Sequence, residues 1–190
     1  MKSNFIINKN GFWETNSGIG HVHDIALCNS LINYLKEENV KTLIDFGCGM
    51  GDYAKSIKKE NILCEAYDGN PNTEILTNGI GKVLDLSKEF NLSKKVDCVL
   101  SLEVGEHIPK EYEQIFIDNI CRHSNSLLIL SWAIVGQPGS GHVNCQNNDY
   151  VVSELNKRGF SYEIESSIKL RNSATNATWF KDTIMIFRKN

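Results

Sequence analysis

The feature that most constrains the fold of this 190-residue chain is an apolar segment followed by three closely spaced glycines. The segment covers residues 42–46 and carries an acid, Asp45, near its end, and the glycines follow at positions 47, 49 and 51. A strand, a glycine turn and then a helix form the beginning of a nucleotide-binding α/β unit. Glycine suits the turn because it adopts positive φ and lets bare backbone approach a ligand. We therefore expect a cofactor to bind where residues 42–46 end, in space that side chains at Gly47 or Gly49 would fill.

The spacing of the glycines distinguishes between cofactors. G-x-G-x-G differs from the G-x-G-x-x-G of dinucleotide-binding folds, which disfavours a dehydrogenase. A phosphate-binding loop would carry Lys-Ser or Lys-Thr where this chain has Asp52 and Tyr53. Since the turn follows a carboxylate and contains no basic residue, a ligand with a cationic or amino-acid part is favoured over a phosphate.

The acid and the three glycines match the acid-x-G-x-G-x-G motif of the class I S-adenosylmethionine-dependent methyltransferases, and the chain resembles this family over about residues 24–190. The resemblance implies S-adenosylmethionine as the cofactor and methyl transfer as the reaction. It implies a cofactor site made of Asp45, Gly47, Cys48, Gly49, Gly51, Asp68, Gly69, Asp85, Leu86 and Glu103.

Two later acids follow predicted strands. Asp68 comes after residues 62–67, where a carboxylate accepts ribose hydroxyls in doubly wound folds. The resemblance gives Asp68 that role and places Asp85 against the adenine amino group. Each acid has a structural alternative, because Asp68 precedes a Gly-Asn-Pro turn and Asp85 could cap the segment that begins at Ser87.

The segment 101–109 follows another predicted strand and contains Glu103, Glu106 and His107. Ligands of open α/β sheets bind beyond the carboxyl ends of strands, so we expect the methyl acceptor here. A near-neutral imidazole can take a proton from an attacking hydroxyl or amine. His107, oriented by Glu106, or His142 from a later Gly-His-Val-Asn loop is the candidate base.

The same residues have metal-ligand spacing, with Glu103, Glu106 and His107 in a Glu-x-x-Glu-His pattern and His142 as a fourth ligand. In this arrangement the segment resembles the small-RNA 3′-end 2′-O-methyltransferases and the ubiquinone-pathway O-methyltransferases. Oxygen-rich sites with one or two histidines suit Mg²⁺, Mn²⁺ or Zn²⁺. Many class I methyltransferases carry a Glu-His pair here without a metal, so both interpretations stay open.

Helical and strand-like segments alternate up to about residue 160, which predicts an α/β fold with helices on both faces of a parallel sheet. With the resemblance, we expect a Rossmann-like, doubly wound, seven-stranded sheet, mostly parallel, with an antiparallel C-terminal hairpin. One domain should cover residues 1–190, with 1–23 as an N-terminal flap and 24–190 as the core. The expected strands are 42–46, 62–67, 82–86, 96–102, 126–135, 161–170 and 183–188, and the expected helices are 23–38, 53–59, 72–76, 112–121 and 148–157.

Composition narrows the function. The net charge of −3 argues against a protein built to grip nucleic acid, although residues 157, 158, 169 and 171 are basic. There is no apolar run of about 18 residues and no secretory signal, and the six cysteines form no C-x-x-C pair, so we expect a cytoplasmic protein without a membrane span. The predicted function is methyl transfer to oxygen or nitrogen of a small polar acceptor such as a sugar or metabolite. A metal-assisted RNA 2′-O-methyltransferase and a non-catalytic cofactor-binding partner subunit are the alternatives, and the oligomeric state is left open.

Overall fold

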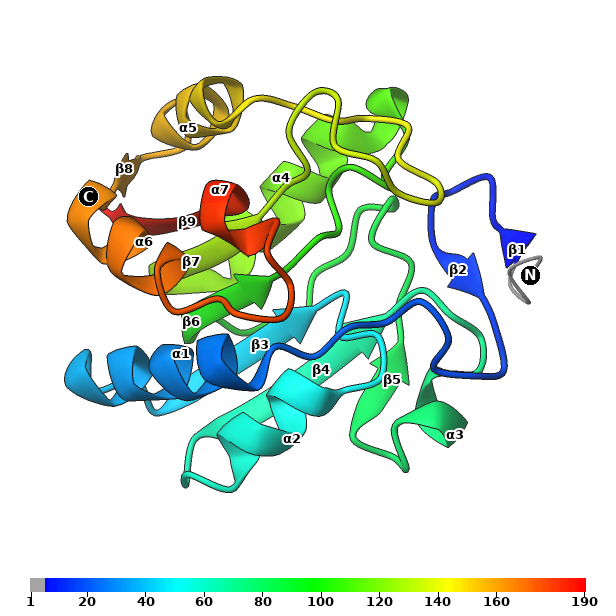
Figure 1. Cartoon of the computed structure of the whole chain (residues 1–190), viewed down its shortest axis with the longest axis horizontal. Coiled ribbons are helices and arrows are strands. Elements are labelled where there is room, and N and C mark those ends of the chain that lie inside the picture. The colour runs from blue at the N-terminus through cyan, green and yellow to red at the C-terminus, as the bar shows by residue number, and fades with distance from the viewer. Residues whose placement is uncertain (1–5) are drawn as a thin grey trace.

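The computed structural model describes residues 6–190, so the first five residues of the predicted N-terminal flap lie outside the described part. Its centre is a seven-stranded sheet with the order β5-β4-β3-β6-β7-β9-β8 (Figure 1). The strands are β3 (Thr42–Phe46), β4 (Leu63–Asp68), β5 (Gly81–Val83), β6 (Val96–Ser101), β7 (Ser124–Ser131), β8 (Phe160–Tyr162) and β9 (Ile184–Lys189). β9 is antiparallel to both of its neighbours, and the other pairs are parallel. This arrangement confirms the predicted Rossmann-like fold.

Helices cover both faces of the sheet (Figure 1). They are α1 (Ile25–Glu37), α2 (Asp52–Lys58), α3 (Thr73–Leu76), α4 (Glu113–His123), α5 (Asn148–Asn156), α6 (Ile164–Arg171) and α7 (Phe180–Thr183), with a short 3₁₀ turn at Lys110–Tyr112. One core lies beneath α1, α2, α6 and α7 and includes Leu31 and Ile57, and the other lies beneath α4 and α5 and includes Phe116 and Val151. Leu43 and Ile44 of β3 are both 0% exposed, as expected for a strand covered on both faces.

The predicted strand over residues 161–170 is wrong for most of its length. Only Phe160–Tyr162 pairs with β9, and the chain then turns into α6. Ser167 explains why the ladder stops, because its hydroxyl accepts the Ile186 N–H of β9 at 2.9 Å. Ile164 and Ile168, which are four positions apart and so share one face of the helix, are both exposed.

Parallel register brings the ends of the central strands to one edge of the sheet. Asp45 of β3 pairs with Ala66 of β4 and Leu100 of β6, so Phe46, Asp68 and Ser101 end close together. A small separate hairpin, β1 (Ile6–Ile7) and β2 (Trp13–Glu14), lies beyond this edge (Figure 1). Within residues 6–190, every helix is too short or too polar to cross a lipid bilayer.

Asp24 joins the start of α1 to the loop that precedes α7. Its side chain caps α1 by accepting the Leu27 N–H at 3.0 Å, and it accepts three further N–H groups from residues 175–177 at 2.7–3.0 Å. Burial raises the pKa of Asp24, but these four hydrogen bonds outweigh it and lower the pKa to about 2. The loop held in this way leads into Thr178–Asp182, which lines the cavity described below.

We expect Asp24→Ala to lower the free energy of unfolding by about 3 kcal/mol, since it removes a helix cap and leaves buried N–H groups without an acceptor. For a chain of this size, the melting temperature should fall by about 6–12 °C in thermal unfolding. Asp24→Asn keeps one oxygen acceptor, so its free energy of unfolding should fall by less than that of Asp24→Ala. A loss below about 1 kcal/mol for the alanine variant would contradict this role.

Candidate functional site

The glycine turn after β3 is built as the sequence predicted, but its neighbours differ. Gly47 and Gly49 have φ angles of 84° and 52°, which favour glycine. A Cβ on Gly47 would lie 2.2 Å from the Val104 side chain, and a Cβ on Gly49 would lie 2.7 Å from the His21 ring. Side chains here would therefore meet protein groups, and the expectation that they would also fill ligand space stays a prediction, since both glycines line the cavity described next.

A cavity of about 600 Å³ opens at this edge of the sheet. Nine of the ten residues predicted to bind the cofactor line it, namely Asp45, Gly47, Cys48, Gly49, Asp68, Gly69, Asp85, Leu86 and Glu103. Gly51 is not among the lining residues and begins α2 with a φ of 75°. His107 and His142 also line the cavity, whereas Glu106 is fully buried behind it. The predicted cofactor side and the predicted acceptor side thus share one space.

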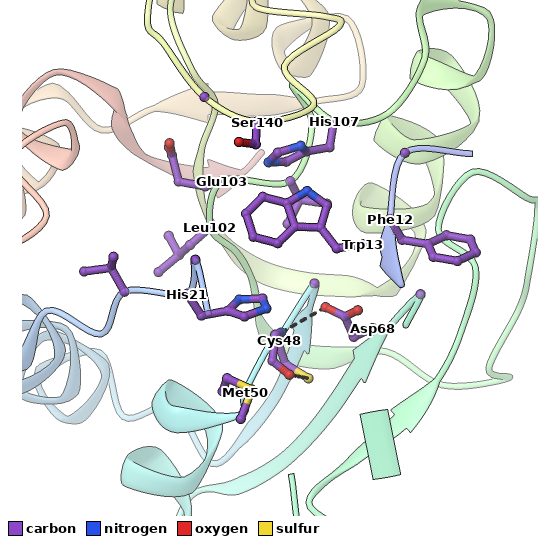
Figure 2. Close-up of a pocket in the computed structure, with 18 of the residues that line it drawn as sticks. Phe12, Trp13, His21, Cys48, Met50, Asp68, Leu102, Glu103, His107 and Ser140 are labelled. Atoms are coloured by element: carbon purple, nitrogen blue, oxygen red, sulfur yellow. Dashed lines mark hydrogen bonds between the residues drawn. The ribbon is translucent and has the colours of Figure 1, made fainter. Parts of the chain in front are cut away.

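Asp68 and Asp45 line the cavity on the predicted cofactor side, and Figure 2 shows Asp68 beside the glycine turn at Cys48. Asp68 accepts the Gly49 N–H and the Asn70 N–H, both at 2.9 Å. It therefore supports the glycine turn and also the turn that follows β4. Asp45 is 4% exposed. Burial, and then the charge of Asp68, raise the pKa of Asp45 to about 7. A positively charged ligand would favour the ionised form of this carboxyl.

The alternative role of Asp85 was a helix cap at Ser87, but residues 87–89 form no helix, and Asp85 closes a local turn there instead. One carboxylate oxygen accepts the Ser87 hydroxyl at 2.6 Å, and the other accepts the Asn10 amide at 2.7 Å. Partial burial raises the pKa of Asp85, but the hydrogen bonds from Ser87 and Asn10 outweigh it and hold the pKa below its usual value. The carboxylate lines the cavity while fastening the N-terminal segment, residues 6–23, to the sheet edge.

Glu103 lies at the acceptor side of the cavity, in a left-handed backbone conformation with φ 54° that is uncommon for a residue other than glycine. Its carboxylate accepts the Gln137 amide at 2.8 Å and the Thr183 hydroxyl at 3.3 Å. Burial raises the pKa of Glu103. The side chain therefore joins β6, the loop after β7 and the end of α7.

His107, His142 and Glu106 form a compact group whose candidate ligand atoms all lie within 4.8 Å of one another. Each imidazole has its Nδ1 3.2 Å from a backbone carbonyl, that of Gly141 for His107 and that of Gln137 for His142. Because a carbonyl only accepts, each Nδ1 carries the proton and each Nε2 has a free lone pair. Glu103 lies outside this group.

Glu106 is the unusual member of the group. It is 0% exposed, and neither carboxylate oxygen has a hydrogen-bond partner. The His142 Nε2 lies 3.9 Å from one oxygen, and the Glu103 carboxyl is also close enough to interact with Glu106. Burial, and then the neighbouring Glu103, raise the pKa of Glu106 well above its usual value. A carboxyl in this setting is either protonated or stabilised by a bound cation.

The N-terminal segment covers the cavity and contributes to its lining (Figure 2). The Trp13 ring packs against His21 and His107, with ring centroids 5.3 and 5.5 Å apart. Phe12 lies on Gly69, where an added Cβ would be 2.5 Å from the phenyl group. These contacts place the Trp13 indole between the imidazoles of His21 and His107, and all three rings line the cavity.

Sequence reasoning missed one part of the lining. Thr178, Trp179, Phe180 and Asp182 line the cavity, although none of them was predicted as a site residue. A tryptophan within a polar segment was the available signal, since a large aromatic side chain there needs a partner surface. Asn10 and Gln137 were also missed, and they bind Asp85 and Glu103.

Comparisons with known proteins agree with the fold. The family model described as "Methyltransferase domain" matches residues 21–163. Magnesium protoporphyrin IX methyltransferase from Synechocystis PCC 6803, solved with S-adenosylhomocysteine, has a TM-score of 0.66 and 19% identity, covering 86% of this chain and 82% of its own. An amino pentose methyltransferase from Micromonospora echinaspora was solved with S-adenosylmethionine. It has a TM-score of 0.69 and 11% identity, and the match covers 91% of this chain and 94% of the other. The methyltransferase domain of bacterial CtHen1 has a TM-score of 0.61 and 15% identity over 86% and 96%. The comparison with curated proteins gave no match.

Proposed function

This chain belongs to the methyltransferase domain family, and we propose that it transfers the methyl group of S-adenosylmethionine to oxygen or nitrogen of a small polar acceptor, such as a sugar or another metabolite. The family membership confirms the predicted enzyme class. The observation that carries the finer proposal is the single cavity, which holds the glycine turn with Asp45 and Asp68 on one side and Glu103 with His107 on the other.

The cofactor side fits S-adenosylmethionine. Asp68 would accept ribose hydroxyls, as carboxylates at this position do in doubly wound folds. The buried Asp45, with its raised pKa, favours a cationic ligand over an anionic one. When bound, the sulfonium supplies an already activated methyl group. The remaining work of the protein is to position the acceptor and remove one proton.

The charge of the cavity indicates the kind of acceptor. Among the described residues that line it there is no lysine or arginine, whereas the lining includes the carboxylates of Glu103 and Asp182. A phosphate or carboxylate acceptor would lack a strong cationic partner, so a neutral or cationic molecule is favoured. Trp13 and Trp179 add aromatic surface, which suits sugar rings and ammonium groups.

His107 is the proposed general base. Its Nδ1 donates to the Gly141 carbonyl, which leaves Nε2 to accept a proton. Burial, and then the charge of His142, lower the pKa of His107 to about 4, so the ring is neutral at physiological pH. Gly141 and Trp13 hold the imidazole at the cavity from two sides, which fixes its orientation.

The second candidate, a metal-assisted RNA 2′-O-methyltransferase, is favoured by one specific observation, the unpartnered carboxylate of Glu106 beside His107 and His142. Two imidazoles and one carboxylate suit Mn²⁺, Mg²⁺ or Zn²⁺, and each imidazole is already oriented by a backbone carbonyl. A bound ion would act as a Lewis acid toward acceptor hydroxyls.

Other observations favour the first candidate over RNA. The basic residues noted in the sequence are already paired, as Lys157 and Arg158 bind Glu154, and Lys169 binds Glu37. Arg171 donates to the Ile184 carbonyl at 2.7 Å. These side chains therefore do not form a free track for a polyanion.

The test is incubation with methyl-labelled S-adenosylmethionine and matched panels of amino sugars, neutral sugars, small acids and short RNAs, with and without a chelator. We expect label in a neutral or cationic small acceptor and turnover that the chelator leaves unchanged. Label in the terminal ribose of RNA, lost with the chelator and in Glu106→Gln, would favour the second candidate instead. Adding Mn²⁺ back after the chelator is the control. Recovery of turnover shows that the chelator acted by removing a metal and not by inhibiting the enzyme directly.

A further inference from the structure

We infer that His21 binds the α-carboxylate of the methyl donor and so fixes the amino-acid end of that molecule at the glycine turn. This inference rests on the proposed function. S-Adenosylmethionine ends in an ammonium and a carboxylate. Asp45, Asp52 and Asp68 offer acceptors for the ammonium, whereas the carboxylate requires N–H or O–H donors.

The glycine turn itself has few donors to give. The N–H groups of Gly47 and Cys48 donate to the Tyr67 carbonyl at 2.7 and 3.0 Å. The Gly49 N–H donates to Asp68 at 2.9 Å, and the Gly51 N–H donates to the Cys48 carbonyl at 2.8 Å. In contrast to a phosphate-binding loop, whose N–H groups point at the ligand, this turn uses these four within the protein.

Many of the other side-chain donors of the cavity are either engaged or buried, since the Tyr53 hydroxyl, the Trp179 indole N–H and the His23 Nε2 are buried from solvent. No lysine or arginine lines it within the described residues. The amide groups of Asn10, Asn70 and Gln137 donate to Asp85, the Thr15 carbonyl and Glu103, at 2.7, 3.0 and 2.8 Å. Besides the Met50 and Asp52 N–H groups and the Ser140 and Thr178 hydroxyls, an imidazole is a donor that the lining leaves for a carboxylate at the glycine turn.

His21 has the right position. Its ring lies directly over Gly49, because a Cβ there would be 2.7 Å from Nδ1. In Figure 2 the ring lies between the glycine turn at Cys48 and the indole of Trp13, with Asp68 nearby. The residue is exposed toward the cavity, and no hydrogen bond of its ring is found among the described residues. An imidazole keeps at least one N–H in either protonation state, so the contact does not depend on its charge.

His23 offers a matched comparison within the same segment. It also lines the cavity, and its ring packs edge-on against Tyr53 with centroids 4.9 Å apart. Its Nε2 is buried from solvent, in contrast to the exposed His21. Replacing either imidazole with phenylalanine keeps an aromatic ring and removes the N–H donors.

The experiment is calorimetry with two ligands, S-adenosylhomocysteine and S-adenosyl-3-thiopropylamine, which is the same molecule without its carboxylate. We expect the wild type to prefer S-adenosylhomocysteine by about tenfold, the contribution of a hydrogen bond to a charged group. In His21→Phe, the affinity for S-adenosylhomocysteine should fall about tenfold, and the affinity for S-adenosyl-3-thiopropylamine should fall by less than about twofold. His21→Gln, which keeps an N–H donor, should recover part of the preference, and His23→Phe should keep the wild-type preference.

Two results would overturn the inference. One is an equal loss for both ligands in His21→Phe, because that indicates a packing role. The other is loss of the preference in His23→Phe but not in His21→Phe. Failure of both ligands to bind the wild type would refute the proposed function as well, so the two failures are distinguishable.

Discussion

Replacing Asp68 with alanine is expected to weaken the binding of S-adenosylmethionine by at least about a hundredfold. The change removes the proposed acceptor of the ribose hydroxyls and the support of the Gly49 and Asn70 N–H groups, which Asp68 accepts at 2.9 Å. Hydrogen bonds to a charged group contribute about 1.5–3 kcal/mol each, and 1.4 kcal/mol corresponds to a tenfold change in affinity. Isothermal calorimetry measures this loss without any acceptor.

Asp182→Ala is the control for lost charge. It removes another carboxylate that lines the same cavity, and it should change the affinity for S-adenosylmethionine by less than about threefold. Thermal unfolding of both variants reports whether the fold is intact. Wild-type affinity in Asp68→Ala would contradict the placement of the cofactor site.

The second large effect is expected at His107. His107→Asn should lower turnover by about a hundred- to a thousandfold, which is in the range that general acid–base catalysis contributes. The affinity for S-adenosylmethionine should change by less than about threefold. Asparagine can still donate to the Gly141 carbonyl, which lies 3.2 Å from His107 Nδ1, but it lacks a group in place of Nε2. Steady-state kinetics and calorimetry on one preparation separate the two quantities.

The pH dependence follows from the same residue. Since the pKa of His107 is lowered to about 4, the ring is neutral and able to accept a proton above that pH. Turnover that depends on it should fall only as the pH drops through about 4, over the range in which the protein stays folded. His142→Asn is the matched control, as it also keeps its contact with a backbone carbonyl. If His107→Asn kept full turnover and His142→Asn lost it, the general base would be His142 and not His107.

The central part of the fold and the cofactor side could be predicted because local sequence determines them. A buried strand, glycines that adopt positive φ and acids at strand ends are all encoded within short segments. Parallel register then brings Asp45 and Asp68 to one edge without further information. Asp85 shows the limit of this reasoning, since the turn that it closes at Ser87 is local whereas its bond to Asn10 joins residues 75 positions apart.

Contacts between distant segments explain what the sequence did not predict. Residues 161–170 were predicted as a strand, but Ser167 accepts the Ile186 N–H and α6 forms instead. The lining from Thr178 to Asp182 depends on Asp24, which holds residues 175–177 from about 150 positions away. Neither contact leaves a periodic signal, because each depends on a single polar side chain.

The most direct test of the account is a crystal structure of the protein with S-adenosylhomocysteine. We predict density for the ligand in the cavity, with its ribose at Asp68 and its amino-acid end beside Gly49 and His21. An empty cavity at a saturating ligand concentration, or the ligand bound at another surface, would contradict the account.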